Sequence, residues 1–229
     1  MTVFSPYYQE DGITIYHGDC RDILPTLEPV DLVLTDPPYV FGIASTEWKT
    51  GWGDLMNASV WYASWLIEAK RLTKSAPGSV WVFNSWRSFP VLARASYDVS
   101  WPIESLLVWD KDWIGPGGVR GLRPQYELIA LFVQPGFAIK NRSLPDVWRQ
   151  KWMSTIGVTE HRAEKPVGIM AKIIKETEAR SVLDPFMGSG TSLIAARQLG
   201  RKAVGIEIEE KYCKMAIERL AQGVLSFES

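Results

Sequence analysis

The sequence is poor in the features that mark secreted, metal-binding and membrane proteins. Cys20 and Cys213 are its only cysteines, and they give neither a metal-binding spacing nor a disulfide framework. No stretch approaches the roughly 18 uncharged apolar residues of a membrane span. The N-terminus lacks the basic and apolar regions of a signal peptide. The chain is therefore expected in a reducing cytoplasm, with no metal site and no membrane partner.

Net charge is also small, because 25 Lys and Arg residues offset 26 Asp and Glu residues to leave −1. This total does not by itself indicate nucleic-acid binding. The charges are unevenly spread, however, since residues 111–165 hold nine basic against five acidic residues and the remainder is acidic. A local basic excess fits a phosphate-contacting surface, although chance on a solvated surface explains it equally well.

Runs of β-branched and aromatic residues alternate with helix-like runs along most of the chain. Strands are expected at residues 12–19, 30–35, 76–85, 103–111, 126–134, 181–186 and 202–208. Helices are expected at residues 20–27, 58–74, 90–99, 165–179, 189–200 and 209–223. This alternation predicts one α/β domain with a mostly parallel, twisted sheet and helices on both faces. Ligands bind beyond the carboxyl ends of the strands in such sheets.

One of these strand ends, in VLDPFMGSGT at residues 182–191, reads as a strand, a tight turn and a helix. Gly188 and Gly190 let the backbone approach a ligand, and the unpaired N–H groups of a helix start attract an anion. The next strand ends in Glu207, about 20 residues past the glycines, where an acid binds ribose hydroxyls in nucleoside-binding folds. The pattern indicates a nucleoside cofactor, and Leu193 in place of a third glycine disfavours a dinucleotide. The turn could also serve only to pack the helix on the strand.

The tetrapeptide Asp36-Pro37-Pro38-Tyr39 follows the strand expected at residues 30–35. Proline has no N–H, so the loop offers only carbonyl oxygens and one carboxylate. Such a site accepts hydrogen bonds from a planar amine, and Tyr39 adds a flat face on which a base can stack. Acceptors at Asp36 and the Pro37 carbonyl would localise the nitrogen lone pair for attack. By itself, the tetrapeptide could equally be a turn capped by Asp36.

Taken together, these stretches resemble the amino-directed DNA methyltransferases that use S-adenosylmethionine. The shared motifs are HGDC at 17–20, TDPPY at 35–39, HRAEKP at 161–166, LDPFMGSGT at 183–191 and GRKAVGIEIEEKY at 200–212. Their order, with the catalytic tetrapeptide before the glycine motif, is that of the family's β group. The resemblance covers residues 11–222 and implies a Rossmann-like methyltransferase domain. Its sheet would include one antiparallel strand, entered by RPQYELIALFV at 123–133.

The resemblance assigns roles by position. The catalytic residues would be Asp36, Pro37, Pro38 and Tyr39. The cofactor-binding residues would be Asp19, Cys20, Lys165, Asp184, Phe186, Gly188, Ser189, Gly190, Thr191 and Glu207. Among these, Ser189 and Thr191 would meet the methionine carboxylate and Glu207 the ribose, while Asp19 and Cys20 would meet the adenine. Lys165 would flank the methionine end.

Two residues near these motifs are given little or no role. The family usually reads His-Pro-Thr-Gln-Lys-Pro where this chain has HRAEKP, so only the outer residues match. His161 is therefore as well explained as a surface residue. Glu127, in the antiparallel strand, is given no chemistry.

The resemblance also divides the chain into a catalytic half at residues 11–133, a short target-recognition insertion at 134–160 and a cofactor-binding half at 161–222. The insertion looks irregular, with scattered Pro, Gly and basic residues. Its candidate phosphate contacts are Lys140, Arg142, Arg149 and Lys151. Trp148 and Trp152 would form a local core or stack on DNA. The polar loop at 42–53 would close over the site.

The expected activity is methyl transfer from S-adenosylmethionine to adenine N6 in duplex DNA, after the base is flipped out. Asp36 favours adenine, because the family's cytosine-N4 enzymes more often have Ser there. Cytosine-N4 methylation, RNA methylation and a catalytically silent cofactor- or DNA-binding subunit remain alternatives, and a nucleotide-dependent oxidoreductase is disfavoured. A homodimer and a cognate restriction nuclease are the expected partners of a bacterial or phage-encoded enzyme.

Overall fold

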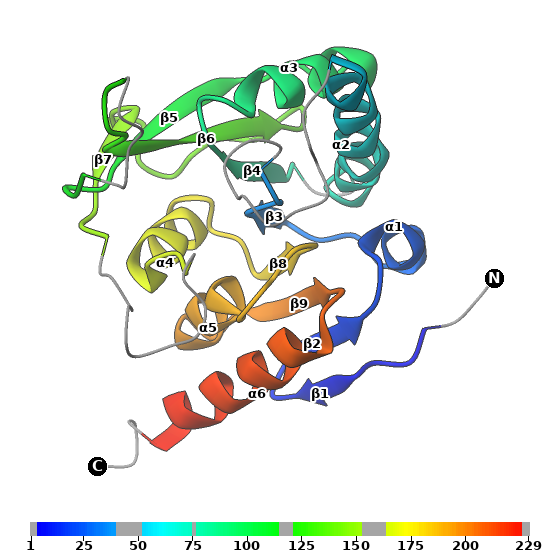
Figure 1. The fold of residues 1–229 in the computed structure, drawn as a ribbon. Coiled ribbons are helices and arrows are strands. Elements are labelled where there is room, and N and C mark those ends of the chain that lie inside the picture. Colours follow the sequence, from blue (N-terminus) through cyan, green and yellow to red (C-terminus); the bar gives the residue numbers. More distant parts are fainter. Residues whose placement is uncertain (1–3, 40–51, 75–76, 115–120, 153–163, 226–229) are drawn as a thin grey trace.

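The computed structural model describes residues 4–39, 52–74, 77–114, 121–152 and 164–225. These residues form one nine-stranded sheet with helices on both sides (Figure 1). The strands are β1 (Tyr8–Glu10), β2 (Ile13–His17), β3 (Leu32–Thr35), β4 (Ser79–Asn84), β5 (Ser105–Asp110), β6 (Tyr126–Val133), β7 (Val147–Arg149), β8 (Ser181–Asp184) and β9 (Lys202–Glu207).

The strands follow the order β1-β2-β9-β8-β3-β4-β6-β5-β7 across the sheet. Every neighbouring pair from β2 to β4 is parallel, so the carboxyl ends of these five strands lie along one edge. β6 is antiparallel to both β4 and β5, which confirms the antiparallel strand expected there. β1, at the sheet edge, is a second antiparallel strand that the sequence analysis does not predict.

Two groups of helices cover the two faces of the sheet. α1 (Cys20–Ile23), the 3₁₀ turn η1 (Leu24–Thr26), α2 (Trp52–Leu72) and α3 (Phe89–Asp98) pack on one face. α4 (Val167–Glu176), α5 (Thr191–Gln198) and α6 (Glu210–Leu225) pack on the other. In Figure 1 the first group lies at the upper right and the second at the lower left.

Burial on both faces explains the residues that the central elements carry. All six residues of β4, SVWVFN, are buried, as expected of a central strand covered on both sides. α4 instead buries one stripe, from Ile169 to Ile174, at helical spacing. α2 begins at Trp52, earlier than the helix predicted at 58–74. The predicted closing loop at 42–53 therefore ends inside a helix, and its residues 42–51 lie outside the described part of the chain.

The described part of the predicted insertion, residues 134–152, is less irregular than the sequence analysis predicts. Its residues 147–149 form β7, which extends the sheet by pairing in parallel with β5. Trp148 is buried in the core cluster of the α4 face, and its ring lies 4.0 Å from the Lys172 ammonium. Trp152 packs against the same cluster. The local-core interpretation of these tryptophans is thus confirmed, while the boundaries of a target-recognition insertion stay a prediction.

Close packing of α5 against α6 gives a prediction on stability. Gly190 precedes α5 with φ +82°, and a Cβ there would lie 2.8 Å from the Ala216 Cβ on α6. Gly200, just past α5, has a similar φ of +63° but open space around it. We expect Gly200→Ala to cost about 1 kcal/mol of unfolding free energy from backbone strain alone. Gly190→Ala should cost about 2 kcal/mol more, because it adds a steric clash. Urea denaturation of both variants measures the difference, and equal losses would contradict the clash.

Candidate active site

The described site residues lie beyond the shared carboxyl edge of the parallel strands. β3 leads directly into Asp36, β8 ends at Asp184 and β9 ends at Glu207. Asp19 follows β2 after one residue, and the Gly18 N–H donates to the Glu207 carbonyl, which joins these two strand ends. The parallel order of the strands therefore brings together groups from distant parts of the sequence.

Asp36 forms a buried ion pair with Lys165. The Lys165 Nζ lies 2.6 Å from Asp36 Oδ2 and 3.1 Å from Glu127 Oε2, so one ammonium bridges two carboxylates. The side chain of Lys165 is only 8% exposed, and those of Asp36 and Glu127 are 24% and 16% exposed. The resemblance places Lys165 at the methionine end of the cofactor, whereas in the structure it contacts Asp36, the predicted catalytic carboxylate.

Glu127 collects three donors, although the sequence analysis gives it no chemistry. Besides Lys165, the Tyr39 hydroxyl donates to its Oε2 at 3.0 Å and the Lys111 ammonium lies 3.3 Å from its Oε1. One signal could have found it. A single carboxylate inside the apolar strand YELIALFV is costly to bury unless it is paired.

The electrostatics of this group follow from burial and from mutual pairing. Burial raises the pKa of Asp36, and the Lys165 ammonium opposes that rise. Burial also works against the charge of Glu127, but Lys165 and Lys111 bring its pKa below the ordinary value. For Lys165, burial would lower the pKa, yet Asp36 and Glu127 raise it above the ordinary value. The ammonium therefore stays charged.

The two carboxylate oxygens of Asp36 differ. Oδ2 is bound to Lys165, whereas Oδ1 is buried and meets no hydrogen-bond donor in good geometry among the described residues, although the Tyr39 hydroxyl is near enough to lower the pKa of this carboxyl. A buried acceptor without a donor is costly. Nearby, the Tyr62 hydroxyl of α2 donates to the Pro38 carbonyl at 3.1 Å, and this hydrogen bond ties the proline loop to α2. The site thus offers one unused, rigidly held acceptor.

The glycine turn is tied to Glu207 at the neighbouring strand end. The Gly188 N–H donates to Glu207 Oε2 at 3.0 Å, and the Glu209 N–H donates to Oε1 at 2.8 Å. Burial raises the pKa of Glu207, and these backbone donors oppose the rise. A carboxylate oxygen can accept two hydrogen bonds, so both oxygens keep capacity for a ligand's hydroxyls.

Asp184, predicted to bind cofactor, is engaged in hydrogen bonds within the protein. Its Oδ1 accepts from the Thr35 hydroxyl at 2.7 Å and from the Phe186 N–H at 3.1 Å, and its Oδ2 accepts from Ser192. The side chain links β8, β3 and α5, and the residue is 4% exposed. Burial raises its pKa to about 6. Its contacts make it a structural support of the turn.

Ser189 and Thr191 meet two residues that the sequence analysis does not single out. The Ser189 hydroxyl donates to Glu164 Oε1 at 2.9 Å. The Arg219 guanidinium, on α6, pairs with Glu164 and donates to the Ser189 hydroxyl at 2.8 Å. A weaker contact of 3.4 Å joins Arg219 to the Thr191 hydroxyl. A protein carboxylate therefore contacts the hydroxyl predicted to hold the methionine carboxylate.

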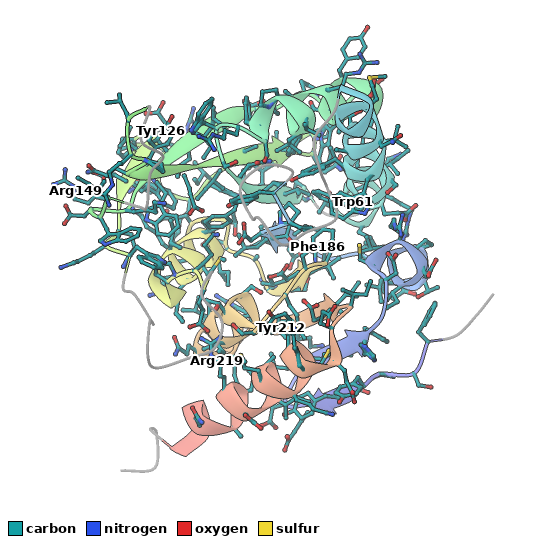
Figure 2. All side chains as sticks on the ribbon, viewed as in Figure 1. Trp61, Tyr126, Arg149, Phe186, Tyr212 and Arg219 are labelled. Atoms are coloured by element: carbon teal, nitrogen blue, oxygen red, sulfur yellow. The ribbon has the colours of Figure 1, made fainter. Side chains whose placement is uncertain are left out.

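The remaining cofactor candidates are Asp19 and Cys20 at the start of α1, and Phe186 after β8. Asp19 caps α1 by accepting from the Arg21 N–H at 2.9 Å. Cys20 is buried, which raises the pKa of its thiol to about 12 and leaves it un-ionised at neutral pH. Phe186 packs against Trp61 of α2, with ring centroids 5.3 Å apart, and Figure 2 shows these two side chains facing each other. They form an aromatic wall beside the glycine turn.

The four candidate phosphate contacts are exposed, and two of them form ion pairs within the protein. Lys140 pairs with Glu178 at 3.2 Å, and Arg149 on β7 pairs with Asp110 at 3.1 Å. Figure 2 shows Arg149 at the left edge of the molecule, whereas Phe186 lies near its centre. Arg142 and Lys151 are exposed, and His161 lies outside the described residues.

A nine-stranded sheet of this order, with an acceptor loop and a glycine turn at neighbouring strand ends, defines the class of Rossmann-like methyltransferases. A family model described as "DNA methylase", of the N6/N4 type, matches residues 30–218. The chain therefore belongs to this family of DNA methylases. Within the described residues, no helix is long and apolar enough to cross a membrane.

Individual relatives agree with this membership. The chain is 32% identical over 208 residues to the Escherichia coli (strain K12) protein named "Putative methylase YubD", covering 89% of this chain and 88% of that protein. It is 29% identical to the DNA adenine methyltransferase YhdJ of the same organism, covering 93% and 84%. Among solved structures, the M1.HpyAVI–SAM complex matches with a TM-score of 0.67 and 25% identity, over 91% of this chain and 100% of that one.

The buried state of Asp184 predicts a pH effect on stability. Its folded pKa of about 6 exceeds the ordinary value of 3.8, so folding favours the protonated form. This contribution is fully present below pH 3.8 and is lost as the pH rises through about 6.

We expect the stability of the wild type relative to Asp184→Asn to fall by about 2 to 3 kcal/mol between these limits, since one pKa unit is about 1.4 kcal/mol. Asn keeps an acceptor for Thr35 and offers a donor to Ser192, so the variant is expected to fold. Denaturant titrations at several pH values measure the difference. A constant difference would show that Asp184 does not titrate in this range.

Proposed function

We propose that this chain transfers the methyl group of S-adenosylmethionine to N6 of a flipped adenine in DNA. The observation that carries the proposal is Asp36 Oδ1, a buried acceptor that no described residue uses. It lies in a loop of two prolines, next to a turn in which the Gly188 N–H donates to the Glu207 carboxylate. An amine would donate a hydrogen bond to Asp36 Oδ1, and the hydroxyls of a nucleoside would donate to Glu207.

The residues present fit this cofactor. Glu207 retains acceptor capacity for ribose hydroxyls at the end of β9, the place expected in nucleoside-binding α/β folds. The wall of Phe186 and Trp61 adds an apolar surface beside the turn. When bound, S-adenosylmethionine supplies a methyl group that the positive sulfur makes electrophilic. Similarity to the M1.HpyAVI–SAM complex supports the same cofactor here.

The protein's own part in the reaction is positioning and electrostatics. Asp36 Oδ1 and the Pro37 carbonyl accept the two amine hydrogens, which draws them out of the ring plane and localises the nitrogen lone pair. That nitrogen forms a bond to the methyl carbon as the carbon–sulfur bond breaks and its electron pair passes to sulfur. The methylated nitrogen then releases one proton to water. With a thiol that is un-ionised, Cys20 is no nucleophile.

A base stacked in a duplex cannot reach an acceptor buried to this degree, so the target base must be flipped, at a cost of a few kcal/mol. Tyr39 is the proposed stacking partner of the flipped base. Its hydroxyl is held by Glu127, which would keep the ring in place while the base enters. Cytoplasmic location, a homodimer and a cognate restriction nuclease stay predictions.

The choice of adenine rests on two observations. Asp36 begins the tetrapeptide, as is typical of adenine enzymes in the family that the chain resembles, and YhdJ is named a DNA adenine methyltransferase. The family model covers N6 and N4 enzymes alike, so membership does not decide the base. Cytosine N4 is the second candidate, because it presents the same kind of amine to the same acceptors.

Nucleoside analysis tests the function. Duplex DNA incubated with the protein and isotope-labelled cofactor should yield labelled N6-methyladenine, and Asp36→Ala should abolish it without loss of cofactor binding. Tyr97→Ala, at a side chain 79% exposed on α3, is the control and should remain active. Label found only in N4-methylcytosine would overturn the choice of base. No label with either DNA or RNA, despite cofactor binding, would indicate a silent subunit.

A second prediction concerns Glu207. Glu207→Gln removes the charge that would receive ribose hydroxyls, and one of its oxygens becomes a donor. Loss of one charged hydrogen bond costs about 1.5 to 3 kcal/mol, so cofactor affinity should fall about tenfold or more. Glu209→Gln, at an exposed side chain two residues on, controls for net charge and should bind normally. Isothermal titration calorimetry with S-adenosylmethionine measures both, and equal affinities would contradict the assignment.

A further inference from the structure

Four charged side chains from separate parts of the chain meet beneath the proposed base pocket. Asp36 follows β3, Lys165 precedes α4, Glu127 lies in β6 and Lys111 follows β5. Lys165 bridges Asp36 and Glu127, and Lys111 pairs with Glu127 alone. The group is therefore balanced, with two positive and two negative charges. The side chains of Lys111, Glu127 and Lys165 are mostly shielded from water.

Lys165 is shared between Asp36 and Glu127, and this sharing bears on how strongly Asp36 accepts a hydrogen bond. The 2.6 Å contact fixes Asp36 Oδ2, which leaves Oδ1 for a ligand. If Lys165 paired with Asp36 alone, its charge would withdraw electron density from both oxygens and weaken Oδ1 as an acceptor. Glu127, 3.1 Å from the same nitrogen, takes part of that interaction. It also receives the Tyr39 hydroxyl, so it anchors the ammonium and the stacking ring at once.

We propose that Glu127 is a positioning residue that competes with Asp36 for Lys165 and so keeps Asp36 Oδ1 a strong acceptor for the target amine. This inference rests on the proposed methyl transfer. Lys165 has the opposite effect on charge: burial raises the pKa of Asp36, and the Lys165 ammonium lowers it and so favours the ionised carboxylate. Neither residue takes up a proton from the substrate, since the ammonium is already protonated and Glu127 has its oxygens engaged.

The two residues act on Asp36 with opposite sign. The charge of Glu127 raises the pKa of Asp36, and that of Lys165 lowers it. Removing Glu127 should therefore lower this pKa, and removing Lys165 should raise it. The titratable and charged groups around Asp36 are Lys165, Glu127, Tyr39, Tyr62 and Asp184, with Lys111 behind Glu127.

Single-turnover rates of methyl transfer to duplex DNA, measured from about pH 5 to about pH 9, report this titration on the reacting complex. In Glu127→Gln the rate at neutral pH should fall at least about tenfold. The acid limb should also move about one pH unit lower. In Lys165→Met the acid limb should move about one unit or more higher. Affinity for S-adenosylmethionine should change less than about twofold in Glu127→Gln, because the cofactor residues are untouched.

Two further variants keep the test decisive. Glu178→Gln, at a side chain 66% exposed, removes a distant charge and should leave rate and pH profile unchanged. If Glu127→Gln does not fold, Glu127→Gln with Lys111→Met removes one buried charge of each sign and should show the same downward shift. Wild-type rate and profile in the folded Glu127 variant, or shifts of the same sign in the Glu127 and Lys165 variants, would overturn the inference. A wild-type protein that methylates no DNA would instead refute the proposed function.

Discussion

The site depends on one interaction, the pairing of the Lys165 ammonium with the carboxylates of Asp36 and Glu127. Removing either partner of such a buried pair leaves an uncompensated charge, so the three residues must be brought together correctly. They come from the end of β3, the start of β6 and the segment before α4. The antiparallel β6 is what makes this possible, because its amino end lies beside the carboxyl end of β4 and so faces the catalytic loop.

Two different kinds of binding group lie along the carboxyl edge of the sheet, one at the end of β3 and one at the end of β9. At β3, prolines leave acceptors without donors, which suits an amine. At β9, Glu207 is held by backbone donors beside the glycine turn, which suits a nucleoside. Asp184 joins the two regions through Thr35 and Ser192, so the distance between them is fixed by buried hydrogen bonds. Such rigidity is what methyl transfer between two bound molecules requires.

Much of the fold could be predicted from sequence, because parallel strands and amphipathic helices repeat with clear periods. Short edge elements could not, since β1 and β7 have three residues each, which is too few to show a strand period. In the site, Asp36 and Glu207 follow from local motifs. The role of Glu127 does not, because its partners Lys165 and Tyr39 are distant in the chain and meet it only in the folded sheet. Arg219 looks like any polar residue of an amphipathic helix.

In the proposed reaction Asp36 presents one oxygen to the target amine while Lys165 holds the other. A crystal structure with target duplex and S-adenosylhomocysteine is the decisive measurement. We expect a flipped adenine whose N6 lies about 3 Å from Asp36 Oδ1, with Lys165 still between Oδ2 and Glu127. A base bound elsewhere, or Lys165 displaced from Asp36 while the amine contacts both oxygens, would contradict it.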